Sequence, residues 1–244
     1  MDSIDVLLAA HRAYLLGWNI GEAGDLDLVT YRSDVPHPPL NGVLRLVGRD
    51  PADALTEARR RLDGVARVWW VGPDSDAGTV DALASLGAAP VITMPIMAVP
   101  IDEASAAPAP AQVQIAEAAD VDEFVTAYAR VSGIPPTGVP AAIARERSFA
   151  GDGTLIRLAG RLNDGRIVGT AVAWLSHGVL TLYYVGTHPE YRRQGIGTAM
   201  TRAALDLAHE RGIRTASLSS TVAGESVYGR LGFRTVGTYR LLSF

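Results

Sequence analysis

The stretch from Ile167 to Glu210 sets the strongest limit on the fold, because its hydrophobic period changes partway along. Two apolar runs, Ile167–Leu175 and Val179–Val185, have the length of buried strands and are separated by a short polar turn. After them, apolar residues recur at helical spacing from Ile196 to Ala208. A strand that leads into an amphipathic helix is a unit of α/β proteins, so neither an all-β nor an all-α fold is expected.

The segments before this unit extend the pattern. Asn163-Asp164-Gly165 is a strong hairpin signal that joins a strand at 155–162 to the strand at 167–175. Further upstream, Val113–Ala116 alternates like a first strand. Asp120 can cap a helix over residues 121–128. The segment 133–140, with three prolines and two glycines, is expected to be a loop, and a second helix is expected at 140–149.

The segments after it complete a mixed sheet. Gly212 is a candidate C-terminal cap for the long helix. We predict a strand at Thr215–Ser219, a short helix at 224–230 and two final strands at 233–236 and 239–242. The predicted fold class is therefore α/β, or α+β with a mixed sheet, with helices on both faces.

A linker divides the chain into two predicted domains. Residues 102–112 are small, contain prolines and lack apolar periodicity, so we predict domains at 1–101 and 113–244. The first domain repeats parts of the second: Val47-Gly48 and Pro51 match Val185-Gly186 and Pro189, and Leu86-Gly87 matches Leu231-Gly232. We interpret residues 1–101 as a shortened, degenerate copy of the second domain.

The composition excludes several classes of function. The 244 residues contain no cysteine, which removes disulfides, iron–sulfur clusters and a cysteine nucleophile. All 22 basic residues are arginine, so no lysine is present for a Schiff base or a P-loop. The formal net charge of -4 has the wrong sign for a surface that must neutralise a phosphate backbone. We therefore expect no nucleic-acid partner.

We expect neither a metal site nor a membrane span. The five histidines are scattered and form no pair at the spacing of metal ligands on a helix. Residues 82–101 and 167–189 are uncharged and long enough to cross a bilayer, but the first contains three prolines and the second breaks at a polar turn. Acidic residues stand where an export signal would place positive charge, so the expected location is the cytoplasm.

An anion site is predicted where the strand that ends at Val185 leads into the long helix. The turn contains two glycines, Gly195 and Gly197, that would let a ligand approach the backbone. The N–H groups of residues 194–198 would be free at the positive end of the helix dipole. Such a site suits a phosphate or a pyrophosphate, and Arg192 or Arg193 can add a charge-assisted contact.

At this point the sequence resembles the GCN5-related N-acetyltransferases, the GNAT family. The loop R/Q-x-x-G-x-G/A of that family is matched by Arg192-Arg193-Gln194-Gly195-Ile196-Gly197. His188-Pro189-Glu190-Tyr191 precedes the loop as in that family, and Tyr228-Gly229-Arg230-Leu231-Gly232-Phe233 begins 31 residues after Gly197. The resemblance covers residues 113–244 and implies the acyl-CoA N-acyltransferase fold, while residues 1–101 resemble the degenerate partner domain of two-domain members.

The resemblance also implies a binding mode and a reaction. The strand that ends at Val185 would splay from the strand around Ser217, and the pantetheine arm of acetyl-CoA would lie in the gap. Val185, Gly186 and Thr187 would pair with that arm, and residues 193–198, up to Thr198, would hold the pyrophosphate. The N–H of Val185 would stabilise the oxyanion. Tyr228 matches the general acid that protonates the thiolate, although a core tyrosine is the structural alternative.

Three positions leave alternatives open. The general base is not evident, and His188, Glu225 and a water chain are candidates. Thr221 stands where some relatives bind the pantetheine with asparagine, so its hydroxyl either substitutes for that amide or caps the last helix. Trp69-Trp70 is either an aromatic wall of the acceptor site or part of a buried strand, which is favoured. The acceptor site is expected beside the loop 133–140 and the turn 176–178.

The predicted function is acetyl-CoA-dependent N-acetylation of a primary amine of a small molecule, by a monomer or homodimer. Acetyl-CoA is expected as co-substrate, without any metal. One alternative is acetylation of a peptide or protein amino terminus. The other is a non-catalytic acyl-CoA-binding module.

Overall fold

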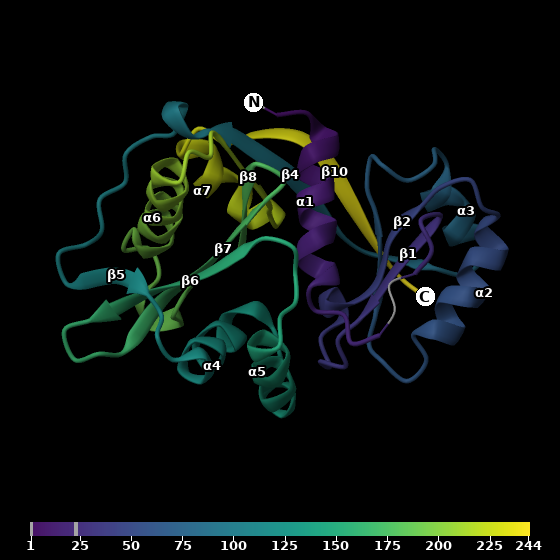
Figure 1. Ribbon diagram of the computed structural model, residues 1–244, viewed down its shortest axis with the longest axis horizontal. Helices are drawn as coiled ribbons and strands as arrows, with labels where there is room; N and C mark the ends of the chain where they lie inside the picture. Colours follow the sequence, from purple (N-terminus) through teal and green to yellow (C-terminus); the bar gives the residue numbers. More distant parts are fainter. Residues whose placement is uncertain (1, 22–23) are drawn as a thin grey trace.

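All strands of the computed structural model, which describes residues 2–21 and 24–244, join into one mixed sheet (Figure 1). The sheet has ten strands in the order β1-β2-β3-β10-β4-β9-β8-β7-β6-β5. The strands of residues 1–101 lie at one end and those of residues 113–244 at the other, apart from β4 and β10 in the middle. The prediction of a mixed α/β fold is confirmed.

The elements of the second half follow the predicted order closely. Asp120 caps α4 by accepting hydrogen bonds from the N–H groups of Asp122 and Glu123 at 2.8 and 3.1 Å. Gly212, with φ 78°, follows the end of α6 as predicted. The bounds are β5 Val113–Glu117, α4 Val121–Ser132, α5 Val139–Arg147, β6 Thr154–Leu162, β7 Ile167–Ser176, β8 Val179–Thr187, α6 Ile196–Glu210, β9 Thr215–Ser219, α7 Val222–Arg230 and β10 Arg234–Ser243.

Two details of this half differ from the prediction. The two expected final strands are one continuous strand, β10, with a bulge between Thr235 and Gly237. The bulge lets the strand bend and keep its pairing with β4, although the sequence between the two apolar runs reads as a break. The segment 133–140 is irregular except for a short 3-10 turn at Pro136–Gly138 and the first residues of α5, which begins one residue earlier than predicted.

The first half is smaller and is built around a parallel strand–helix–strand unit. Strands β2 and β3 are parallel and are connected by α2, as β8 and β9 are connected by α6. Gly87 and Gly232 both have φ 94° and follow the helices α3 and α7. The bounds are α1 Ile4–Leu16, β1 Leu28–Arg32, β2 Asn41–Leu46, α2 Pro51–Arg61, β3 Val68–Val71, α3 Thr79–Ser85 and β4 Ala89–Pro100. The origin of this half as a degenerate copy stays a prediction.

The two halves exchange their last strands. Strand β4, which ends the first half, pairs with β9 of the second half from Ile96↔Ser219 to Pro100↔Thr215. Strand β10, which ends the chain, pairs with β3 and β4. Figure 1 shows β10, in yellow, running from the side of α7 toward the strands of the first half. Each half therefore lacks a neighbouring strand when the other is removed. Hydrogen bonds between strands join the parts of the chain on the two sides of the predicted linker at 102–112.

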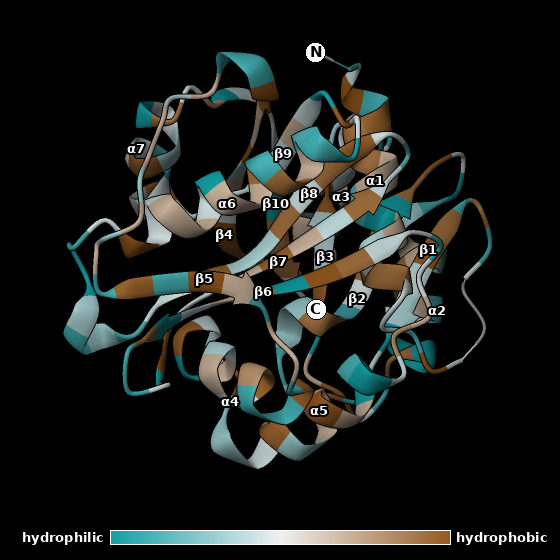
Figure 2. Cartoon of the chain, turned by 60° about the vertical axis from the view of Figure 1, so that its left-hand side comes forward, coloured by the Kyte–Doolittle hydropathy of each residue, from teal (hydrophilic) through white to brown (hydrophobic). Residues whose placement is uncertain are grey.

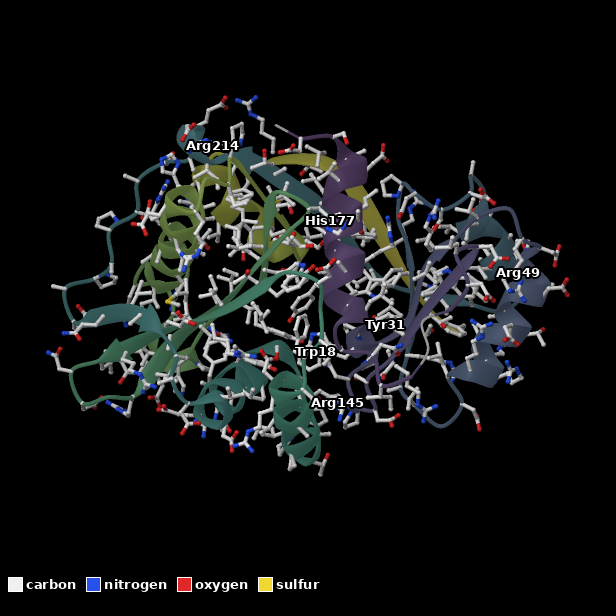
Figure 3. The ribbon with its side chains drawn as sticks, viewed as in Figure 1. Trp18, Tyr31, Arg49, Arg145, His177 and Arg214 are labelled. Carbon is white, nitrogen blue, oxygen red and sulfur yellow. The ribbon has the colours of Figure 1, made fainter. Side chains whose placement is uncertain are left out.

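Helix α1 also belongs to both halves. It packs on β7 and β8, and the indole Nε1 of Trp174 donates a hydrogen bond to the carbonyl oxygen of Ala10 at 3.1 Å. Just beyond α1, the ring of Trp18 meets those of Phe149 and Tyr184 edge-on. Trp18 and Tyr31 are labelled in Figure 3, where the side chains of the two halves meet. The first helix is thus part of the core of the second half.

The apolar core lies on both faces of the sheet. Helices α1, α4 and α5 cover one face, and α6 and α7 cover the other, with α2 and α3 beside the first-half strands. Figure 2 shows apolar residues along the central strands and hydrophilic residues on the outer sides of the helices. Within the described residues, no helix has the length and apolar character needed to cross a membrane.

We expect the two halves not to fold when they are produced separately. Without residues 1–101, strand β9 loses β4, and the buried side chains of Met97 and Val99 no longer cover it. An unpaired central strand edge promotes aggregation. A chain that begins at residue 105 should therefore be insoluble or lack a cooperative thermal transition. Co-expression with residues 1–104 should restore both, and an independently stable fragment 105–244 would contradict the prediction.

Candidate active site

A gap opens between two parallel strands at the centre of the sheet. Strands β8 and β9 pair from Val179↔Thr215 to Leu182↔Leu218 and then separate. The register of β8 against β7 shifts at the same place, and Tyr184 has the left-handed φ of 48°. Val185 consequently has no register partner on β7 or β9 within the described residues. The splay that the resemblance implied is present, with Val185 at its mouth.

A hydrogen bond holds this irregular backbone in place. The hydroxyl of Thr170, on β7, donates to the carbonyl oxygen of Tyr184 at 2.9 Å. The ring of Tyr184 stacks on that of Tyr128, with centroids 4.2 Å apart. A non-glycine residue at positive φ is strained by about 1–2 kcal/mol, so these contacts are needed to keep the bulge.

The start of α6 forms an open anion cradle. Gly195 has φ 81°, and a side chain built on it would meet no atom within 4 Å. No side chain caps the helix, and the first N–H groups of α6 have no acceptor among the described residues. Arg192 and Arg193 are exposed beside the cradle and form no ion pair with any described residue. This arrangement fits a pyrophosphate.

A cavity of about 530 Å³ begins at the splay and continues into the first half. Val185 and Tyr228 both line it, so the structure brings these two predicted site residues together. Gly186, Thr187 and residues 192–198 do not line this cavity within the described chain. Other lining residues, from both halves, include His11, Tyr14, His37, Trp70, Met94, Leu182, Tyr183, Ser219, Thr221 and Leu241.

Tyr228 has the protonation state that a general acid needs. It projects from α7 and meets the ring of Phe233 edge-on at 5.8 Å between centroids. Burial raises its pKa to about 12, so the phenol stays protonated at neutral pH. A protonated phenol at this position carries a proton that can pass to the thioester sulfur as the C–S bond breaks.

Thr221 and Trp70 each have a structural role and also line the cavity. The hydroxyl of Thr221 accepts a hydrogen bond from the N–H of Gly224 at 3.2 Å and so caps α7, although the residue also lines the cavity. Trp69 and Trp70 are both buried in β3, as favoured, and Trp70 lines the cavity as well.

The two named candidates for the base lie elsewhere. Glu225 accepts a hydrogen bond from Thr235, and His188 lies beside Tyr191 at a separate cavity of about 380 Å³. Neither side chain lines the cavity of Tyr228 within the described chain. The expected neighbours of the acceptor, the loop 133–140 and the turn 176–178, do not line it either within the described residues. Residues of the first half, such as His11, Trp70 and Met94, line the cavity instead.

His11 is one of several cavity residues that the sequence did not indicate. It is 5% exposed, and its Nδ1 lies 2.9 Å from the hydroxyl of Tyr183. Burial, and secondarily the charge of Arg12, lowers the pKa of His11 to about 3. No motif surrounds His11 in the sequence, and its place beside β8 depends on the packing of α1 against the other half. A single sequence carries no signal for that contact.

We expect His11 to make the protein sensitive to acid. Its pKa is lower in the folded state than the ordinary value of 6.5, so the unfolded chain binds the proton more tightly. The stability due to neutral His11 is complete above pH 6.5 and is lost as the pH falls toward 3. One such group changes the unfolding free energy by about 1.4 kcal/mol per pH unit. Tyr183, Tyr239 and the ion pair of Arg12 with Asp74 surround the ring.

Urea unfolding at pH 6.5 and pH 5 tests this expectation. Wild type should lose about 2 kcal/mol more than His11→Gln over that interval, because Gln cannot take up a proton. Contributions of all other groups cancel in the difference between the two proteins. Equal losses in wild type and variant would show that His11 is not held neutral.

Comparison with known proteins agrees with this geometry. Residues 126–233 match the model of the acetyltransferase (GNAT) family, a range that contains the splay, the cradle and Tyr228. No curated protein matches the sequence.

Solved structures share the fold over both halves. A GCN5-related N-acetyltransferase from Kribbella flavida is similar with a TM-score of 0.72 and 23% identity, over 97% of this chain and 93% of that one. Another from Sphaerobacter thermophilus has a TM-score of 0.59 and 20% identity, over 78% of this chain and 65% of that one. A tandem GNAT protein from the clavulanic acid biosynthesis pathway has a TM-score of 0.60 and 15% identity, over 88% and 77%. Residues 126–233 therefore form a GNAT acetyltransferase domain, the acyltransferase family that the loop and Tyr228 indicated, and the whole chain shares its fold with solved GNAT structures.

Proposed function

We propose that this protein transfers the acetyl group of acetyl-CoA to a primary amine of a small molecule. One observation carries the proposal: Val185, at the end of the splayed strand, and Tyr228 line the same cavity, and residues of the first half form further walls of it. The oxyanion donor and the acid thus face one space, and a small acceptor can enter it.

The binding of acetyl-CoA follows from the two open features of β8 and α6. The pyrophosphate would lie on the N–H groups of residues 194–198, with Arg192 or Arg193 as charged neighbours. The pantetheine arm would enter the splay and pair with the backbone of Val185, Gly186 and Thr187. The thioester would then reach the cavity from the side of β8.

The reaction would proceed without a covalent enzyme intermediate. The amine nitrogen attacks the thioester carbon, and the N–H of Val185 donates to the oxygen that becomes negative. When the tetrahedral intermediate collapses, the C–N bond remains and the C–S bond breaks. Tyr228 gives its proton to the sulfur, and the nitrogen loses one proton. Of the bases considered, a water chain remains, because neither His188 nor Glu225 lines the cavity.

The size of the cavity supports a small acceptor. Its volume of about 530 Å³ lies within the range of small-molecule sites. It extends beneath α1 and the segment around Pro39 and Leu40, both from the first half. These elements add walls on the side of the cavity opposite β8, which favours a compact acceptor over an extended peptide.

The test is a thiol-release assay with acetyl-CoA and a panel of amines, together with mass spectrometry of the acceptor. We expect at least one small primary amine to gain an acetyl group and to release one CoA thiol per product. Acetylation of a tetrapeptide amino terminus alone would favour the peptide alternative. Stabilisation by acetyl-CoA without any turnover would favour a binding module.

A further inference from the structure

Helix α1 brings an unsatisfied polar group to the reaction cavity. The Nε2 atom of His11 is buried and has no hydrogen-bond partner among the described residues. Tyr14, one turn further along the same helix, is also buried, and its hydroxyl lies close to that of Tyr184. Both side chains line the cavity that also contains Val185 and Tyr228. A buried polar atom without a partner costs about 1–3 kcal/mol, so the unpartnered Nε2 of His11 at this cavity points to a ligand.

The surroundings of His11 fix its orientation. Its Nδ1 is engaged with the hydroxyl of Tyr183, and its ring packs edge-on against Trp70 at 5.1 Å between centroids. The ring of Tyr239 lies 4.9 Å away on another side. The contact with Tyr183 is compatible with both tautomers of the neutral imidazole. In the tautomer whose Nδ1–H donates a hydrogen bond to the Tyr183 oxygen, Nε2 presents a lone pair. The imidazole is then an acceptor for an N–H group of a ligand.

The cavity excludes charged groups by its composition. None of its described lining residues is Asp, Glu or Arg, and the ionisable ones are two histidines and several tyrosines. Burial lowers the pKa of His11 and also that of His37, so both stay uncharged near neutral pH. The remaining wall is largely apolar, with Leu15, Leu40, Trp70, Ile92, Met94 and Leu241. A carboxylate or a second ammonium on the acceptor would have no partner here.

We propose that the first half of the chain forms the acceptor site, in which His11 Nε2 accepts a hydrogen bond from the nitrogen of an amine on an uncharged, apolar body. This inference rests on the proposed function, because it concerns the acceptor of the same reaction. The apolar lining, which has no carboxylate among its described residues, favours the uncharged amine, and a hydrogen bond from one N–H to His11 leaves its lone pair free to attack the thioester. His11 is then a binding residue contributed by a half that lacks the CoA loop.

Two matched variants separate binding by Nε2 from packing by the ring. His11→Asn keeps a polar atom near the position of Nδ1 but leaves none at Nε2. His11→Gln reaches the position of Nε2 with its amide. With phenethylamine as the acceptor, the KM for the amine should rise roughly tenfold in His11→Asn and stay near wild type in His11→Gln. The KM for acetyl-CoA should be unchanged in both. Equal effects of the two variants, or a parallel rise in the KM for acetyl-CoA, would overturn the role of His11.

A substrate panel on the wild-type protein keeps the inference testable even if a variant is unstable. Phenethylamine and phenylalanine share the ring and the amine and differ by one carboxylate, and spermidine adds further positive charges. We expect kcat/KM for phenethylamine to exceed that for phenylalanine and spermidine by roughly 100-fold or more, because a buried unpaired charge is costly. Equal or faster acetylation of the charged acceptors would refute the inference and leave the proposed function intact. Failure to acetylate any amine of the panel would refute both.

Discussion

Replacing Gly195 by Glu is expected to abolish the binding of acetyl-CoA. The backbone at this position opens to solvent at φ 81°, with free N–H groups from the first turn of α6 beside it. A carboxylate there would occupy the place of the pyrophosphate and repel it. The loss of charge-assisted hydrogen bonds together with this repulsion should raise the dissociation constant at least roughly 100-fold.

Gly212→Glu is the matched control for this change. Gly212 has φ 78°, also faces open space, and lies at the opposite end of α6. Both variants carry the same strain of about 1–2 kcal/mol for a side chain in the left-handed region. In a thermal shift assay, a ligand at about 100 times its dissociation constant stabilises a protein by about 2.7 kcal/mol. Acetyl-CoA should therefore raise the melting temperature of wild type and of Gly212→Glu, and should leave that of Gly195→Glu unchanged. A retained shift in Gly195→Glu would place acetyl-CoA elsewhere.

Replacing Tyr228 by Phe is expected to remove turnover and leave acetyl-CoA binding intact. The ring packs against Phe233, and burial alone accounts for its raised pKa, so loss of the hydroxyl should not disturb the fold. Without the phenol, the thiolate must leave unprotonated or take a proton from water. General acid catalysis contributes roughly 100- to 10,000-fold, and kcat should fall by that factor.

Single-turnover kinetics with saturating acetyl-CoA measure this effect directly. The thermal shift with acetyl-CoA should match that of wild type, which distinguishes Tyr228→Phe from Gly195→Glu. A variant with nearly full turnover would assign Tyr228 to the packing of α7 and require another proton donor. A variant that loses the thermal shift would place the hydroxyl in acetyl-CoA binding.

Gly195→Glu, Tyr228→Phe and the two variants of His11 test three different parts of one site. Gly195 belongs to the cradle, Tyr228 to the leaving group and His11 to the acceptor. If the site works as proposed, Gly195→Glu loses acetyl-CoA binding, Tyr228→Phe loses turnover and His11→Asn loses affinity for the amine. Each loss is measured in a separate experiment.

The features that could be predicted correctly are those that depend on neighbouring residues. The hairpin at residues 163–165, the cap at Asp120 and the strand-to-helix turn at 185–197 were all predicted, because turn chemistry, capping and period act within a few residues. The resemblance of the loop and of Tyr228 to one family rested on the same kind of local signal. The family match over residues 126–233 confirms that resemblance.

The way in which the two halves share a sheet and a cavity could not be predicted, because it depends on contacts between residues far apart in the sequence. The exchange of β4 and β10 joins residues more than 100 positions apart, as in the pairing of Ile96 with Ser219. The contact of His11 with Tyr183 spans 172 positions, between a helix with no motif and the strand that carries the family pattern. Such pairings are selected by the burial of whole surfaces, which depends on all the packed elements together. A local pattern of residues therefore does not indicate which distant elements pack together.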